Sequence, residues 1–145
     1  MKLENEVPQL KYCKRLEELG YNSAGLYRWM ENPKVGKSQV ISTVEPCSEV
    51  KKWHEVDKID EELENTYHLA PTLAEMGEWL PGSITTDIKE YWLNITKPSN
   101  QLGLWRVRYT NTIGKGSYSV EHGKTETDAR AKMLIYLAKS KYIKF

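Results

Sequence analysis

The chain has 145 residues, of which 39% are hydrophobic and 28% are charged, and its formal net charge is +1. This length supports one domain with a real core, and so small a net charge gives no overall field that would draw the chain onto nucleic acid or an anionic membrane. Two cysteines exclude a disulfide framework, and no run reaches the roughly 18 apolar residues of a membrane helix, so we expect a cytoplasmic protein with no membrane partner.

The first third of the chain predicts a helix and a hairpin. The helix runs from Pro8 to Leu19, because apolar side chains recur there at helical spacing before Gly20 ends the run. Extended segments at 25–30 and 38–44 follow, separated by the turn-forming sequence Asn-Pro-Lys-Val-Gly. We expect these two segments to pair as a hairpin.

Residues 46–68 have the weakest pattern in the chain. Val56, Ile59 and Leu63 fit a short amphipathic helix, whereas the acidic run at 60–64 fits a solvated connector. Both alternatives remain open for this segment, which we treat as a flexible connector within a single domain of residues 1–145.

A second helix is clearly indicated within 70–81. Thr72 and Glu75 have the spacing of a capping box, in which each side chain accepts a hydrogen bond from a backbone N–H at the helix start. Apolar residues from Leu73 onward form one stripe, and Pro81-Gly82 ends the helix. Residues 83–90 lead into the next elements as a further turn of helix.

The C-terminal part predicts three strands and a helix. Apolar and polar residues alternate with period two at 91–96, 104–109 and 117–121. A helix covers 129–138, and Thr125 with Asp128 forms a pair at its start that resembles a capping box. We therefore expect an α+β fold: a mainly antiparallel sheet of about three to five strands, covered by helices that begin near Pro8, Leu73 and Thr127.

The strand alternation also predicts a binding face. If Trp105, Val107 and Tyr109 face the helices, Arg106 and Arg108 face outward. Trp92 and Lys97 are expected to join the two arginines in this contact face. The expected partner is another protein or a second copy of the chain; the alternative is weak nucleic-acid binding by the same face, because aromatic side chains interleaved with cations suit single strands.

No motif in the sequence indicates catalysis or a cofactor. Cys47, His54 and His68 lie close in sequence but lack the paired spacing of structural zinc ligands. The glycine-rich stretch 114–116 is too short for a phosphate-binding loop and has no Ser or Thr after its lysine. We expect no catalytic residues, no cofactor and no metal site.

The order strand–strand–strand–helix, with Gly123-Lys124-Thr125 before the helix, resembles the second half of a double-stranded-RNA-binding domain. That family grips phosphates with a lysine pair at the helix start. The corresponding positions here are Glu126 and Thr127, followed by Asp128. Acidic groups there would repel phosphates, so nucleic acid is not the favoured partner.

A second resemblance concerns the biological origin of the protein. The sequence APTLAEMGEWLP at 70–81 resembles a segment of small uncharacterised phage and prophage proteins. Residues 105–109 and 127–134 are similar to the phage α/β/α sandwich domain family, whose function is unknown. The resemblance covers roughly 69–137 and rests on helix caps and core positions, so it implies a fold and no functional residues. It leads us to expect a non-enzymatic accessory protein of phage or mobile-element type that acts through protein–protein interaction or self-association.

Overall fold

The computed structural model describes residues 3–22, 25–32, 36–42, 65–98, 103–111 and 116–145. Most of the 46–68 segment, including its expected short helix or connector, lies outside the described residues. Its last residues are described, and Thr66 to His68 belong to a strand rather than to a connector. Pairing with a neighbouring strand outweighs the weak local pattern there, as is common for β-structure.

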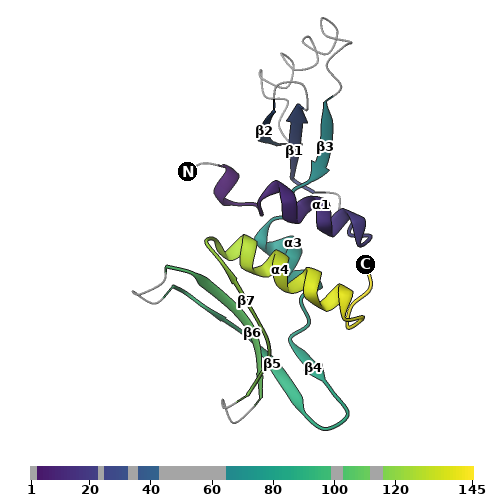
Figure 1. The fold of residues 1–145 in the computed structure, drawn as a ribbon, viewed down its shortest axis with the longest axis vertical. Coiled ribbons are helices and arrows are strands. Elements are labelled where there is room, and N and C mark those ends of the chain that lie inside the picture. Colours follow the sequence, from purple (N-terminus) through teal and green to yellow (C-terminus); the bar gives the residue numbers. More distant parts are fainter. Residues whose placement is uncertain (1–2, 23–24, 33–35, 43–64, 99–102, 112–115) are drawn as a thin grey trace, which may run out of the picture.

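The strands form two antiparallel sheets (Figure 1). The three-stranded sheet has the order β2-β1-β3, with β1 at Tyr27–Asn32, β2 at Lys37–Ser42 and β3 at Thr66–Leu69. The four-stranded sheet has the order β4-β5-β6-β7, with β4 at Ser83–Thr85, β5 at Glu90–Thr96, β6 at Trp105–Asn111 and β7 at Ser117–Gly123. The expected α+β class, the early hairpin and the three C-terminal strands are confirmed; the strands are divided between two sheets, each of the expected size.

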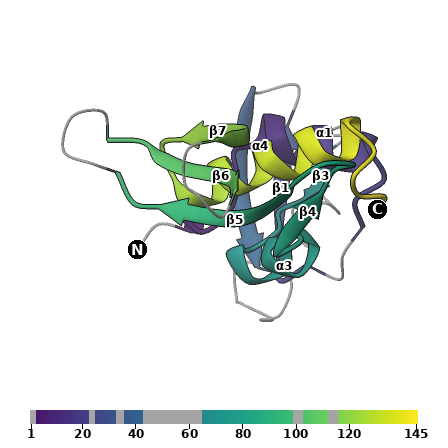
Figure 2. The same cartoon turned by 90° about the horizontal axis from the view of Figure 1, so that it is seen from below.

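The helices lie between and beside the sheets. They are the short 3₁₀ helix η1 at Leu3–Asn5, α1 at Leu10–Glu18, α3 at Leu73–Trp79 and α4 at Glu126–Lys139. Both views show α4 lying along the four-stranded sheet (Figures 1 and 2), and α1 contacts both α4 and β3. The three expected helices are confirmed. Among the described residues, none of the helices combines the length and the apolar character that crossing a membrane requires.

Residues 83–90 differ from the expected turn of helix. Ile84 is buried and Thr85 is exposed, the alternation of a strand. The chain then turns back at Thr86, whose backbone N–H donates to the carbonyl of Lys89 at 2.9 Å. The segment is therefore strand β4 and the hairpin turn into β5, because a partner strand is available on one side.

Two clusters of buried side chains hold these elements together. The larger lies between α4 and the four-stranded sheet and includes Val107, Tyr109, Met133, Leu134 and Leu137. The smaller packs α1 against β1 and includes Val7, Cys13, Trp29 and Ala70. Trp29 Nε1 also donates to the carbonyl oxygen of Pro8 at 2.8 Å, so the hairpin is fixed to the start of α1.

The two predicted helix caps have different outcomes. At α3 the capping box is complete: Glu75 N donates to Thr72 Oγ1 at 3.3 Å, and Thr72 N donates to Glu75 Oε2 at 2.8 Å. At α4, Thr125 Oγ1 accepts from Asp128 N at 3.1 Å, but the Asp128 carboxylate accepts from Gln9 instead of returning to Thr125. Only the first half of that expected box is present, because α1 supplies a competing donor.

Candidate functional site

The outer face of the four-stranded sheet carries the residues that strand alternation predicts for it. Val107 and Tyr109 are fully buried against the helices. Arg106 and Arg108 alternate with them on β6 and therefore lie on the opposite face. In Figure 1, α4 lies on one side of this sheet and no described element covers the other. The expected orientation of β6 is confirmed.

Arg108 lies at the centre of this outer face. Antiparallel pairing places Asn94 of β5 and Val120 of β7 opposite it. Trp92 lies on the same face, two residues from Asn94, and is 47% exposed. Lys97 is exposed but follows the last residue of β5, so strand pairing does not place it on this face. The structure places Trp92 on the same face as the two arginines, one row from Arg108 and two rows from Arg106, and leaves Lys97 beyond the strand end.

Two polar atoms at this centre are shielded from solvent without a hydrogen bond. Among the described residues, neither Arg108 Nε nor Asn94 Oδ1 has a hydrogen-bond partner, although the two residues are directly paired across β5 and β6. A buried donor or acceptor without a hydrogen-bond partner lowers the free energy of unfolding by about 1–3 kcal/mol. A contact that reorients the Arg108 side chain would recover part of that cost.

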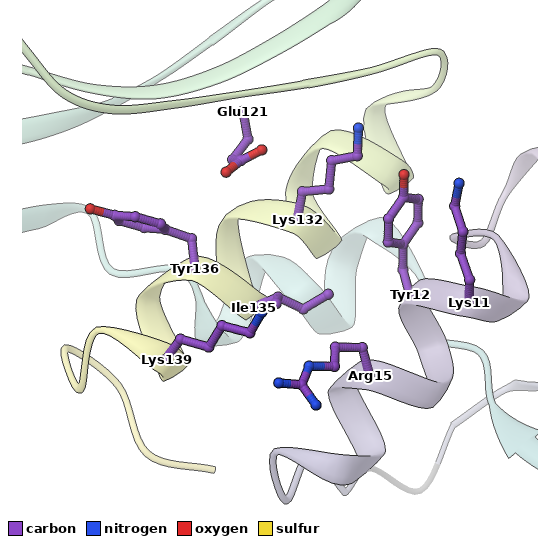
Figure 3. A pocket seen from close by; sticks show the side chains of 8 residues that line it. All are labelled: Lys11, Tyr12, Arg15, Glu121, Lys132, Ile135, Tyr136 and Lys139. Carbon is purple, nitrogen blue, oxygen red and sulfur yellow. The ribbon is translucent and has the colours of Figure 1, made fainter.

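A second surface, a groove of about 470 Å³, lies between α1, α4 and β7 (Figure 3). It is lined by Lys11, Tyr12 and Arg15 of α1, by Lys132, Ile135, Tyr136 and Lys139 of α4, and by Glu121 of β7. Leu16 and Met133 are fully buried and set which side of each helix faces the core. The charged side chains next to Leu16 and Met133 therefore point into the same groove, which is lined by four cations and one carboxylate.

An aromatic ring at the groove holds one cation from each wall. Lys11 Nζ lies 4.8 Å and Lys132 Nζ lies 5.4 Å from the centroid of the Tyr12 ring. Lys132 Nζ also donates to the carbonyl oxygen of His122 at 2.6 Å, at the free edge of β7. A ring face or a carbonyl attracts an ammonium group without neutralising it. The positive charge of both lysines therefore remains available at the groove.

A cluster of tyrosines supports the α4 wall. The Tyr136 ring packs against Tyr118 at a centroid distance of 6.4 Å, and Tyr118 packs against Tyr91 and Tyr142 at 5.3 and 5.4 Å. Tyr118 donates a hydrogen bond to the hydroxyl of Tyr142 at 2.6 Å. This hydrogen bond, and then burial, raises the pKa of the Tyr118 phenol, so Tyr118 adds no negative charge beside the groove at neutral pH.

No family model matches this sequence, and no curated protein or solved structure matches it either. The resemblance to phage and prophage proteins therefore remains an expectation.

The surroundings of Cys13 do not suit a reactive thiol. The Cys13 side chain is fully buried, and burial, followed by the negative charges of Glu17 and Asp128, raises the pKa of its thiol to about 12. Such a thiol is not a nucleophile at neutral pH. Cys47 and His54 lie outside the described residues. Within the described part of the chain, no group of three or more His, Cys, Asp or Glu side chains is arranged to hold a metal ion.

His68 lies between two carboxylates. Its Nδ1 is 2.8 Å from Glu17 Oε2, and its Nε2 is 3.6 Å from Glu31 Oε2, which is too long for a hydrogen bond. Lys14 Nζ contacts the same Glu31 oxygen at 2.6 Å, and this contact is the main cause that lowers the pKa of Glu31. The group joins β3 and β1 to α1, so its evident role is structural.

Sequence reasoning missed the groove although a partial signal was present. Lys11 and Arg15 are spaced by four residues on the first helix, and Lys132 and Lys139 are spaced by seven on the last. Each pair lies along one side of its helix, because three to four residues complete a turn. Neither pattern shows that the two basic faces meet, which is a property of the tertiary packing.

Proposed function

We propose that this chain is a non-enzymatic binding protein, an accessory protein of phage or mobile-element type, which contacts another protein through the outer face of its four-stranded sheet. The observation that carries the proposal is a half-exposed Trp92 on the same face as Arg106 and Arg108, one row of the sheet from Arg108, on a face that no described element covers. Tryptophan and arginine are the residue types most enriched where protein contacts are strongest.

Further features of this face support a protein partner. Val120, 37% exposed and opposite Arg108, extends the apolar surface onto β7. The unpartnered atoms of Arg108 and Asn94 lie between Val120 and Trp92. Apolar and aromatic side chains together with arginine are typical of protein interfaces.

The alternative is nucleic-acid binding by the same face. Arg106 and Arg108 of β6 share this face with Trp92 of β5. Cations near an aromatic ring suit a single strand. Salt separates the two possibilities, because phosphate contacts make the affinity fall steeply between 50 and 200 mM salt, whereas an apolar protein contact changes little.

The test uses the charge-reversed variant R106E/R108E as bait in affinity capture from cells that express the protein. The matched control is K37E/K89E, which reverses two exposed lysines on β2 and in the β4–β5 turn. We expect the captured partner to be lost with R106E/R108E and with Trp92→Ala and retained with the control, while the thermal midpoints of all variants stay close to that of the wild type.

Light scattering of the purified chain tests for a second copy as the partner. A particle of twice the monomer mass that becomes monomeric in R106E/R108E would identify self-association through this face. Equal capture by the wild type and R106E/R108E, together with an unchanged particle mass, would rule the face out as the contact surface.

A further inference from the structure

We propose that the groove between α1 and α4 binds the phosphodiester backbone of single-stranded nucleic acid. This inference concerns a different surface from the sheet face and does not depend on the proposed protein contact. It would place nucleic acid on a surface that strand alternation did not indicate.

The first argument is the charge of the groove. Lys11 and Arg15 on one wall and Lys132 and Lys139 on the other oppose Glu121 alone. Among the ion pairs of the described residues, the only one that involves these cations joins Arg15 to the exposed Glu18. Exposed pairs of this kind are weak and readily exchanged. The groove therefore offers nearly its full positive charge to a ligand.

The second argument is the fixed position of two of the cations. Lys11 and Lys132 come from different helices, and both ammonium groups lie over Tyr12. Most surface lysines lose side-chain rotational entropy when a ligand immobilises them. Here part of that loss occurs on folding, because the ring already holds both side chains. Figure 3 shows the two ammonium groups on either side of the Tyr12 ring.

The third argument is shape. With a rise of 1.5 Å per residue, Lys132 and Lys139 lie about 10 Å apart along α4, and Lys11 and Arg15 about 6 Å apart along α1. Cations spread over this length complement the successive phosphates of a strand better than they complement a single small anion. Because α1 and α4 are in contact, their axes lie on the order of 10 Å apart, so the groove over their junction is narrow. A single strand can lie in it, whereas a duplex would contact only its rim.

The fourth argument is the distribution of charge along the chain. Residues 43–64 contain eight carboxylates and three lysines, so the rest of the chain has 18 basic and 12 acidic side chains. The remaining residues therefore carry an excess of six positive charges, although the whole chain is nearly neutral. A local field that attracts a polyanion is compatible with this arrangement.

The experiment measures fluorescence anisotropy of labelled dT20 and rU20 with the full chain at 50 and 200 mM NaCl. Each phosphate contact to a single strand contributes about −0.7 to the slope of log affinity against log salt, so four cations predict a slope of about −3. The variant K132Q/K139Q should bind at least about fivefold more weakly at 50 mM NaCl, and its slope should be smaller by about 1.4.

Two further variants test whether the affinity depends on the sign of the charge change and on its position in the groove. Glu121→Gln removes the carboxylate that lines the groove among the described residues and should strengthen binding about twofold to threefold, an effect that misfolding cannot imitate. K37Q/K89Q makes the same net charge change as K132Q/K139Q away from the groove and should change the affinity less than twofold. Circular dichroism melting checks that each variant is folded.

The outcomes separate this inference from the proposal about the sheet. If R106Q/R108Q abolishes dT20 binding and K132Q/K139Q does not, nucleic acid binds the sheet face and the groove inference is wrong. Equal losses in K132Q/K139Q and K37Q/K89Q would show attraction by net charge only. Absence of binding to dT20 and rU20 at 50 mM NaCl, or a preference for a 20-base-pair duplex, would also overturn it.

Discussion

The carboxylate of Asp128 receives two hydrogen bonds from Gln9, one from its backbone N–H at 2.8 Å and one from its side-chain Nε2 at 2.7 Å. Gln9 is the residue before α1, and Asp128 lies in the first turn of α4. Gln9 is the N-cap residue of α1, so the carboxylate accepts from the N-cap backbone N–H, as the Glu side chain of a capping box normally does within its own helix. It also ties together the two helices whose outer faces form the basic groove.

The first prediction concerns this link. Asp128 is 3% exposed, and Asp128→Ala leaves two donors of the exposed Gln9 without their charged acceptor. We expect the free energy of unfolding to fall by about 3 kcal/mol, and Asp128→Asn to lose about half as much because one acceptor remains. Urea denaturation measures both values. The exposed Asp87 gives the control: Asp87→Ala should change stability by less than about 0.5 kcal/mol, and a similarly small change for Asp128→Ala would contradict the assignment.

The second prediction concerns Gly123, the last residue of β7, which lies two residues before the N-cap of α4. A Cβ at this position would lie 2.5 Å from the backbone nitrogen of Ala129 and 2.8 Å from the carbonyl oxygen of Thr125. Because both atoms belong to backbone, Gly123→Ala should destabilise the protein by about 3 kcal/mol, the upper end of the cost of overpacking. Gly82 has open space around the same position. Equal thermal midpoints for Gly123→Ala and Gly82→Ala would show that the contact between β7 and α4 is looser than described.

The third prediction concerns the pH dependence contributed by Cys13. Its pKa is about 12 in the folded chain, against a value of 9.0 for an exposed thiol. Below pH 9 both states keep the proton, so the contribution to stability is constant. Above pH 9 only the unfolded chain releases it, so the free energy of unfolding falls by up to about 1.4 kcal/mol per pH unit. Urea denaturation at pH 8, 9 and 10 should show this additional fall in the wild type and not in Cys13→Ala; parallel profiles would refute it.

The local features of the fold were predictable from the sequence because they depend on neighbours in the chain. Thr72 and Glu75 satisfy each other's backbone N–H groups whatever else surrounds α3. Alternation on β6 placed Val107 inside and Arg108 outside, since the pleat of a strand fixes the two faces. The short strand β3 was missed because its pairing with β1, and not its own pattern, selects its conformation.

The groove was not predictable because it depends on charges that meet only in space. The net charge of +1 suggested a chain without a basic surface, since it averages the acidic residues 43–64 with the rest. Likewise, Asp128 has the spacing of a capping-box residue, and its actual partner Gln9 lies 119 positions away. Where a local and a distant partner compete for the same carboxylate, the sequence shows only the local one.

The last prediction concerns Glu17, which joins α1 to the three-stranded sheet. One carboxylate oxygen lies 2.8 Å from His68 Nδ1, and the other accepts a hydrogen bond from the backbone N–H of Leu69. Glu17→Ala removes both contacts from β3, a strand of four residues with one edge against β1. Because charge-assisted hydrogen bonds are the stronger kind, we expect a loss of about 2–3 kcal/mol and faster hydrogen exchange of the Leu69 amide.

The neighbouring residue supplies the control for that experiment. Glu18 has the same chemistry, but its side chain is 59% exposed and pairs only with Arg15 on the surface of α1. Exposed ion pairs contribute at most about 1 kcal/mol, so Glu18→Ala should leave the Leu69 amide as protected as in the wild type. Amide exchange followed by NMR distinguishes the two variants residue by residue. If Glu17→Ala and Glu18→Ala expose that amide equally, β3 is held by its pairing with β1 alone, and the carboxylate of Glu17 does not fasten the sheet to the helix.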